Sequence, residues 1–177
     1  MKRILLKYDS LHQVTGSSEL WVIVLTDEQG EKAVSVVCDE DIAVQLRLRF
    51  NAPEISKILL PEALVQMLPS TYEMLIVGIY DGQYQVMLMD TRTGNSVRLR
   101  MSDAILLSII STVPLYIEEE LMKRQAYPVE DFSKGVAIPI NAMGMEYLRK
   151  AMDKAVAEEN YELASHIRDE INHRKRH

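Results

Sequence analysis

The chain has 177 residues, of which 47% are hydrophobic and 26% charged, with 7 glycines and 6 prolines. This composition is typical of one globular domain with a small addition, and it excludes disordered and collagen-like chains. The net charge of −6 excludes binding of nucleic acid by bulk attraction, so such binding would need a local basic patch or a bridging cation.

Three features point to the cytoplasm. No apolar run approaches the length of about 18 residues that a membrane-spanning helix needs, so no membrane association is expected. The early charges Lys2 and Arg3 are unlike a secretory leader. The lone Cys38 excludes an intramolecular disulfide and is typical of a reduced intracellular protein.

The first part of the chain alternates strand patterns with short helical patterns. A turn that contains Gly30 joins two β-branched runs, which predicts a hairpin. Apolar residues at helical spacing predict a helix over 42–50, and Pro61 begins a second one through Leu68. The predicted strands are 2–8, 20–26 and 32–37.

The same order of patterns then returns. Ser102 is the predicted N-cap of a helix through Ser111, and an apolar run at 115–117 precedes an acidic helix at 118–125. The predicted strands are 72–80, 83–90 and 95–100. The halves align about 62 to 64 residues apart, which places Asp41 opposite Asp103.

We therefore predict an α+β fold in which residues 1–127 form two duplicated β3α2 units that share one mainly antiparallel sheet. The alternative is a chance likeness between two α+β segments.

Residues 128–144 are predicted to be a linker with at most a short docked strand, because proline and glycine interrupt every periodic run. Residues 145–177 contain neither, and two apolar stripes predict an α-helical hairpin with Asn160 in a left-handed turn. The stripes, which are expected to face each other, are Leu148, Met152 and Ala155, and Tyr161, Ala164, Ile167 and Ile171.

A lone hairpin of about 33 residues buries too little apolar surface to be stable alone. It should therefore dock on its own core, on a second copy or on another protein. The predicted partner-binding residues are Leu148, Met152, Tyr161, Ala164, Ile167 and Ile171.

Two runs in the second unit carry a family resemblance, Val97–Ile105 (VRLRMSDAI) and Val113–Leu121 (VPLYIEEEL). They are similar to the R-P-S-D-A-I run and the P-I-Y-V acidic segment of the bifunctional nuclease (BFN, DNase/RNase) domain family. The resemblance implies a duplicated α+β fold and hydrolysis of RNA and DNA. Three positions differ: Met101 replaces the proline, Leu60-Pro61-Glu62 stands where many members have Thr-His-Asp, and the glycine usual before the first-half helix is absent from Val37-Cys38-Asp39.

The run from Leu148 to Ala164, with Ile167–Ile171 after it, resembles the UVR motif. That motif occurs in excinuclease subunits B and C and in some Clp ATPases and their adaptors. The resemblance implies that the hairpin mediates protein–protein contact.

The candidate catalytic residues are Arg100, Ser102 and Asp103, which cluster at a strand-to-helix junction. A helix N-terminus offers N–H groups to a phosphate, Arg100 can fork onto its oxygens, and Asp103 can hold a cation or position water. The alternative is a purely structural role, in which Ser102 and Asp103 only stabilise the start of the helix. Residues 118–120 could add carboxylates, or simply begin a solvated helix.

The sequence thus predicts a cytoplasmic nuclease that cleaves phosphodiester bonds in RNA and DNA with a divalent cation, Mg²⁺ or Mn²⁺, whose ligands it does not identify. A protein partner or a second copy would bind through the hairpin, and a homo-oligomer is expected. The alternative is a non-catalytic scaffold that the UVR motif recruits to a repair or Clp-type proteolysis machine. The missing His-Asp and the change from proline to Met101 favour this alternative.

Overall fold

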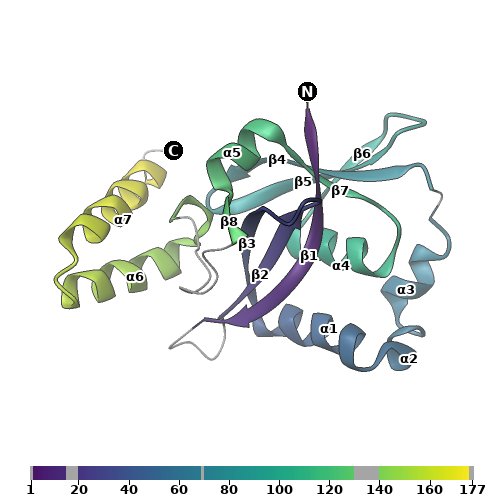
Figure 1. Cartoon of the computed structure of the whole chain (residues 1–177), viewed down its shortest axis with the longest axis horizontal. Coiled ribbons are helices and arrows are strands. Elements are labelled where there is room, and N and C mark those ends of the chain that lie inside the picture. Colours follow the sequence, from purple (N-terminus) through teal and green to yellow (C-terminus); the bar gives the residue numbers. More distant parts are fainter. Residues whose placement is uncertain (1, 15–19, 69, 130–139, 176–177) are drawn as a thin grey trace.

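An eight-stranded sheet runs through the centre of the protein (Figure 1). The computed structural model describes residues 2–14, 20–68, 70–129 and 140–175. The strands are β1 (Arg3–Gln13), β2 (Leu20–Asp27), β3 (Lys32–Asp39), β4 (Tyr72–Tyr80), β5 (Gln83–Asp90), β6 (Ser96–Leu99), β7 (Leu115–Glu118) and β8 (Tyr127–Pro128). Their order is β6-β5-β4-β7-β1-β2-β3-β8, and neighbours are antiparallel except β4 with β7. The predicted α+β fold with a mainly antiparallel sheet is confirmed.

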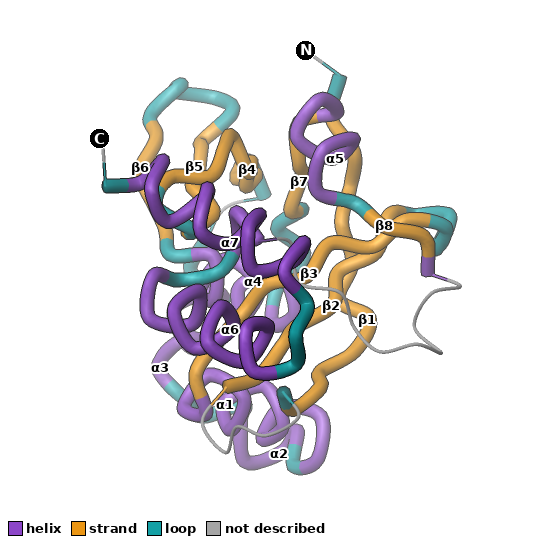
Figure 2. Tube along the Cα trace, turned by 90° about the vertical axis from the view of Figure 1, so that its left-hand side faces the viewer, coloured by secondary structure: helices purple, strands orange, loops and turns teal. Residues whose placement is uncertain are grey.

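Helices lie against the sheet and in a separate C-terminal hairpin (Figures 1 and 2). Leu46 and Ile105, from the two longer sheet-packed helices, are fully buried in one apolar cluster with Ile23, Met74 and Ile117 of the sheet. The helices of the sheet region are α1 (Glu40–Asn51), α2 (Pro53–Ser56), α3 (Leu60–Val65), α4 (Met101–Ile110) and α5 (Glu119–Gln125). The hairpin consists of α6 (Met145–Ala157) and α7 (Tyr161–Arg174). No helix in the described part of the chain is long and apolar enough to cross a membrane.

The two halves repeat one structural unit. Each has three consecutive antiparallel strands, β1-β2-β3 or β4-β5-β6, followed by a long helix, α1 or α4. The first strand of each unit has a register shift, between Tyr8 and Ser10 in β1 and between Ile76 and Gly78 in β4. A chance likeness would not reproduce this irregularity, so the predicted duplication is confirmed.

The turns in the second hairpin of each unit are similar in composition. Asp27 and Asp90 end β2 and β5; the Asp27 carboxylate accepts the Glu31 and Lys32 N–H groups, and the Asp90 carboxylate accepts the Arg92 N–H. Each turn closes with a glycine at positive φ, 70° at Gly30 and 74° at Gly94, a conformation that glycine adopts without strain. The carboxylate and the glycine together explain why both turns form at these positions.

The halves differ after their long helix. The first continues into α2 and α3, whereas the second continues into β7 and α5. Strand β7 lies between β1 and β4 and therefore joins the two units into one sheet.

The prediction that Ser102 is the N-cap of the second-half helix was wrong. Arg100, in extended backbone conformation, is the N-cap of α4, and Ser102 lies in the first turn. The helix begins early because Met101 is 7% exposed and packs into the core. In α1, by contrast, Asp39 is a true cap, and its Oδ1 accepts the Ile42 N–H at 3.0 Å.

The hairpin forms as predicted, although its turn differs. Leu148, Ile167 and Ile171 are at most 5% exposed and form the hairpin's own cluster. Tyr161 does not join this stripe, because it begins α7 with 66% of its surface exposed. Glu159, not Asn160, takes positive φ (56°), and Asn160 caps α7 by accepting the Leu163 N–H at 3.2 Å.

The predicted linker at 128–144 is described only at its ends. Strand β8 pairs with β3 at Lys32 and Ala33, and a short 3₁₀ turn covers Ile140–Ala142. The intervening residues 130–139 lie outside the described residues.

Candidate functional site

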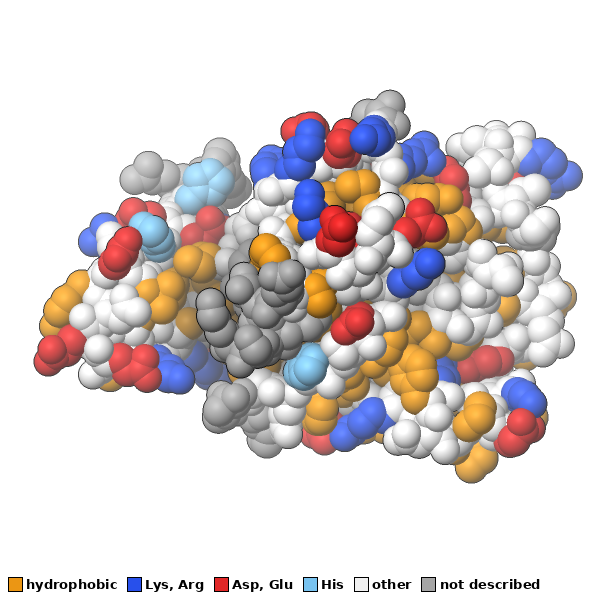
Figure 3. Space-filling model, viewed as in Figure 1, with side chains coloured by type: hydrophobic (Ala, Val, Ile, Leu, Met, Phe, Trp, Pro, Cys, Tyr) orange, Lys and Arg blue, Asp and Glu red, His pale blue; other side chains and the backbone are white. Residues whose placement is uncertain are grey.

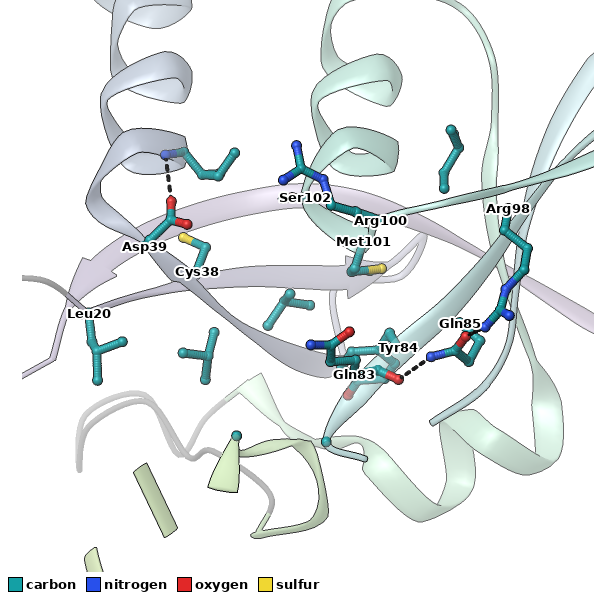
Figure 4. A pocket seen from close by; sticks show the side chains of 16 residues that line it. Leu20, Cys38, Asp39, Gln83, Tyr84, Gln85, Arg98, Arg100, Met101 and Ser102 are labelled. Atoms are coloured by element: carbon teal, nitrogen blue, oxygen red, sulfur yellow. Dashed lines mark hydrogen bonds between the residues drawn. The ribbon is translucent and has the colours of Figure 1, made fainter. Parts of the chain in front are cut away.

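An open cleft of about 570 Å³ lies where the two strand-to-helix junctions of the repeated unit meet (Figure 4). The first half contributes the end of β3 and the start of α1, and the second half contributes β5, β6 and the start of α4. The lining residues are Leu20, Val36, Val37, Cys38, Asp39, Ile42, Gly82, Gln83, Tyr84, Gln85, Arg98, Leu99, Arg100, Met101, Ser102 and Gly144. Duplication thus places two equivalent junctions around one cavity.

Arg100 supplies an exposed cation at the cleft. Its Nε lies 2.7 Å from Oδ2 of Asp103 and its Nη2 lies 2.9 Å from Oδ1, while 75% of its side chain is exposed. The hydrogen bond and the charge of Asp103, and more weakly the charge of Asp39, raise the pKa of Arg100. The guanidinium therefore stays charged and is held at the surface, where an incoming anion can reach it.

The three predicted catalytic residues lie together, but they do not all face the cleft. Arg100 and Ser102 line it, whereas Asp103 is outside the lining and binds Arg100 instead. No side chain caps α4, so N–H groups of its first turn point toward the cleft end without a side-chain acceptor. This junction presents hydrogen-bond donors and a positive helix end.

Tyr84 adds a donor that the sequence did not reveal. It is 6% exposed, and its hydroxyl has no hydrogen-bond partner. Burial, and to a lesser extent Tyr127, raises the pKa of the Tyr84 phenol. The side chain therefore stays neutral. Tyr84 lines the cleft, whereas its hydroxyl oxygen is itself buried and lacks an acceptor.

The remaining polar wall is preorganised. Arg98 donates to Oε1 of Gln85, and Nε2 of Gln85 donates to the carbonyl of Gln83 at 3.0 Å. Asp39 is the only carboxylate among the described lining residues. Cys38 is a packing residue, because burial and the neighbouring Asp39 raise the pKa of its thiol to about 12.

Comparison with known families places this site in context. The model of the bifunctional nuclease domain matches residues 23–130. The chain belongs to the bifunctional nuclease domain family. The UvrB/UvrC motif matches residues 146–175, which covers the hairpin, and comparison with curated proteins found no match.

The bifunctional nuclease domain does not show a ready-made metal site in its described residues. They hold no group of three or more His, Cys, Asp or Glu side chains placed to bind one ion. Asp39 caps α1 and Asp103 binds Arg100. The acidic run at 118–120 lies outside the cleft lining, and Glu119 and Glu120 pair with Lys2 and Lys123.

The UvrB/UvrC hairpin lies beside this cleft. Gly144 lines the cleft just before α6, and Gly82 of the β4–β5 turn lines it from the sheet. The side chain of Arg174 is 5% exposed and donates to the Met143 carbonyl at 2.6 Å, with Nε 2.7 Å from Glu170. Arg174 thus ties the end of α7 to the segment that enters the hairpin, rather than offering its charge to a phosphate.

Proposed function

We propose that this protein is a nuclease that hydrolyses phosphodiester bonds in RNA and DNA at the cleft between the two repeats. One observation carries the proposal: Arg100 and the uncapped start of α4 present hydrogen-bond donors to one cavity, and the unsatisfied Tyr84 hydroxyl is buried in a residue that lines it. Membership of the bifunctional nuclease domain family supports it.

Local charge at this cleft matters because the molecule as a whole is acidic. On the face shown in Figure 3, acidic and basic side chains are interspersed and no broad basic surface gathers. The protein has a net charge of −6, which repels a polyanion. Binding a nucleic acid therefore needs a few strong hydrogen-bond donors placed at its phosphates. The junction of β6 and α4 supplies them.

Each residue has a proposed role. Arg100 forks onto the nonbridging oxygens and offsets the charge that develops there. Ser102 and the first-turn N–H groups of α4 fix the phosphate, and Asp103 positions Arg100. Tyr84 donates to a phosphate oxygen, and the second carboxylate oxygen of Asp39 orients the attacking water.

A divalent cation, Mg²⁺ or Mn²⁺, belongs to the proposal only as an ion that enters with the substrate. The described carboxylates do not fit a preformed site, since Asp39 and Asp103 already have partners. We therefore assign no ligand set and no step to the metal.

The hairpin is proposed to dock a protein partner, with the UvrB/UvrC motif as support. Leu148, Ala164, Ile167 and Ile171 already bury their surface inside the hairpin, so Tyr161 and the half-buried Met152 are the predicted residues with surface left to offer. Assembly into a homo-oligomer and a cytoplasmic location complete the proposal; the buried free thiol of Cys38 fits a reducing compartment.

The test is cleavage of labelled single-stranded RNA and DNA by the purified full chain with Mg²⁺, with Mn²⁺ and with EDTA. We expect Arg100→Ala to slow cleavage by about 100-fold, the usual cost of removing one donor to developing charge. Its melting temperature should hardly change, because an exposed ion pair contributes little stability. Arg124→Ala removes the same charge on α5, outside the cleft lining, and should cleave normally.

Absence of cleavage in every arm, or equal cleavage by Arg100→Ala and the wild type, would overturn the proposal. The first result would leave a scaffold recruited through the hairpin as the better description.

A further inference from the structure

The hairpin meets the sheet at the β4–β5 turn, between two cavities. Gly82 of this turn lines the cleft on one side and a second cavity of about 610 Å³ on the other. The sheet contributes residues 79–82 to the second cavity, and the hairpin contributes both of its ends, Asn141 with Met145 and 173–175. A contact with open space on both sides is narrow, so little packing holds the hairpin against the sheet.

The buried guanidinium of Arg174 fixes the segment that enters the hairpin, residues 140–144, to the end of α7. Its Nη1 donates to the Met143 carbonyl at 2.6 Å, and its Nη2 donates to the carbonyls of Asn141 at 3.1 Å and Ile140 at 3.4 Å. The Arg174 side chain is 5% exposed, and a buried charge is costly without such partners. The entry segment and the two helices therefore move as one body.

This body also forms one wall of the cleft. Gly144 belongs to the cleft lining. In Figure 4 the pale yellow-green ribbon of the entry segment lies on the side of the cleft opposite Arg100 and Ser102. The two repeats thus supply the fixed walls of the cleft, whereas the hairpin supplies a wall from outside them. A displacement of the hairpin changes the opening of the cleft.

The hairpin can separate from the sheet without exposing either core. In the described part of the chain, the apolar cluster of the sheet and that of the hairpin have no residue in common. At the contact, Asp81 lies 3.9 Å from Nη1 of Arg174 with 64% of its side chain exposed, which makes a weak ion pair. Two firm bodies joined by a weak contact favour rigid-body motion.

We propose that the hairpin is a lid on the cleft. The Asp81–Arg174 pair and the fit of Gly82 against the Met143 carbonyl hold it closed. A protein that binds the open hairpin more tightly than the closed one shifts the lid toward the open position. Control of the nuclease by such a protein rests on the proposed function, whereas the lid itself does not.

The experiment uses Cys38 as a reporter, because it is the only cysteine of the chain, lines the cleft and is 7% exposed. We measure the rate at which the thiol reagent DTNB modifies Cys38 in the full native chain at one fixed pH. Arg174→Gln should react about 10-fold faster, because the charge-assisted hydrogen bonds that hold the entry segment are lost. Arg168→Gln is the matched control on α7. Arg168 is 60% exposed and pairs with Asp169, so this variant should react like the wild type.

A second measurement separates opening of the lid from unfolding of the sheet. Trp21 is the only tryptophan and lies in β2, so its fluorescence during urea unfolding reports the sheet. Arg174→Gln should leave this transition unchanged. A fall in sheet stability that accounts for the faster labelling would overturn the proposal.

Asp81→Asn decides the case should Arg174→Gln lose helix content by circular dichroism. It removes the ion pair from the sheet side and leaves the contacts inside the hairpin intact, and Asn before Gly82 keeps the tight turn. We expect labelling of Cys38 about 3-fold faster than in the wild type, the effect of a weak ion pair. Asp169→Asn, which breaks the pair with Arg168 on α7, should have no effect.

Unchanged labelling in Asp81→Asn and in a folded Arg174→Gln, or equal acceleration by the two controls, would show that the hairpin is not a lid. No arm of the experiment measures cleavage. Failure of the lid therefore leaves the proposed nuclease standing, and failure of the nuclease leaves the lid standing.

Discussion

The Tyr84 hydroxyl is buried beside the cleft without a hydrogen-bond partner. An unsatisfied buried hydroxyl costs a protein about 1–3 kcal/mol, so its presence at a cavity needs a reason. Binding of a phosphate oxygen would supply the missing acceptor. The fold therefore gives up some stability at the position where the proposed ligand regains it.

Tyr84→Phe separates these two effects. We expect the free energy of unfolding to rise by up to about 1 kcal/mol, because the orphan hydroxyl is removed while the ring still fills its place. Cleavage should slow by roughly 10-fold, since one donor to the bound phosphate is lost. Urea unfolding and the nuclease assay on the same preparation measure both quantities.

Tyr127→Phe is the control, since it also removes one buried tyrosine hydroxyl. Unlike that of Tyr84, the Tyr127 hydroxyl has a hydrogen-bond partner, the Ser35 hydroxyl at 2.5 Å. This variant should lose stability and keep its cleavage rate. If Tyr84→Phe instead loses stability and cleaves normally, the Tyr84 hydroxyl has no role toward a ligand.

Residue-level chemistry was only partly predictable. Arg100 and Ser102 could be placed at the cleft because a strand pattern ends and a helical pattern begins there. Tyr84 could not, since a tyrosine within an alternating strand is indistinguishable from ordinary core. Asp39 was missed because its role depends on the first junction facing the second, which is a tertiary property.

At the scale of elements, the β4–β5 turn is where the sheet and the hairpin segment meet. Gly82 has φ of 74°, and a Cβ atom there would lie 2.3 Å from the Met143 carbonyl oxygen and 2.7 Å from Nη1 of Arg174. Asp81 lies 3.9 Å from Nη1 of Arg174. A glycine is thus required both by the backbone conformation and by the close approach of the hairpin segment.

Gly82→Ala should displace the hairpin. Positive φ alone costs alanine about 1 kcal/mol, and the clash with backbone adds about 1–3 kcal/mol unless the hairpin moves away. We expect faster hydrogen exchange in α6 and α7, measured by mass spectrometry, together with lower thermal stability.

Gly94→Ala is the matched control, because Gly94 has the same φ of 74° but nothing within 4 Å of an added Cβ. Gly94→Ala should lose only the stability that positive φ costs alanine, and it should leave hydrogen exchange in α6 and α7 unchanged. Equal exchange in the two variants would mean that the hairpin does not rest on this turn.

Elements were more predictable than their connections. Local signals sufficed for the second hairpin of each repeat, since Gly30 and Gly94 mark the turns between the strand patterns. The placement of β7 between β1 and β4 depends on pairing over long sequence distances, which periodicity does not encode.

At the scale of the whole molecule, apolar packing divides into two clusters. One contains the sheet with α1 and α4, and the other contains Leu148, Ile167 and Ile171 with Ile140 and Met143 packed against them. The hairpin approaches the sheet through Arg174 and the β4–β5 turn. The second cluster begins before the predicted boundary at 145, because Ile140 and Met143 belong to it. That the hairpin is a separable module stays a prediction.

Deletion of residues 140–177 tests that separation, because it removes the whole second cluster and leaves the first intact. We expect the remaining chain to unfold cooperatively, since its own apolar cluster is complete. It should lose capture of a protein partner, and Tyr161→Ala in the full chain should weaken the same capture by about 2 kcal/mol if Tyr161 is an anchor. Calorimetry and pull-downs give the two readouts. A truncated chain that no longer unfolds cooperatively would show instead that the hairpin belongs to the folding unit of the sheet, and the exposed Tyr161 would then be a feature of one continuous domain.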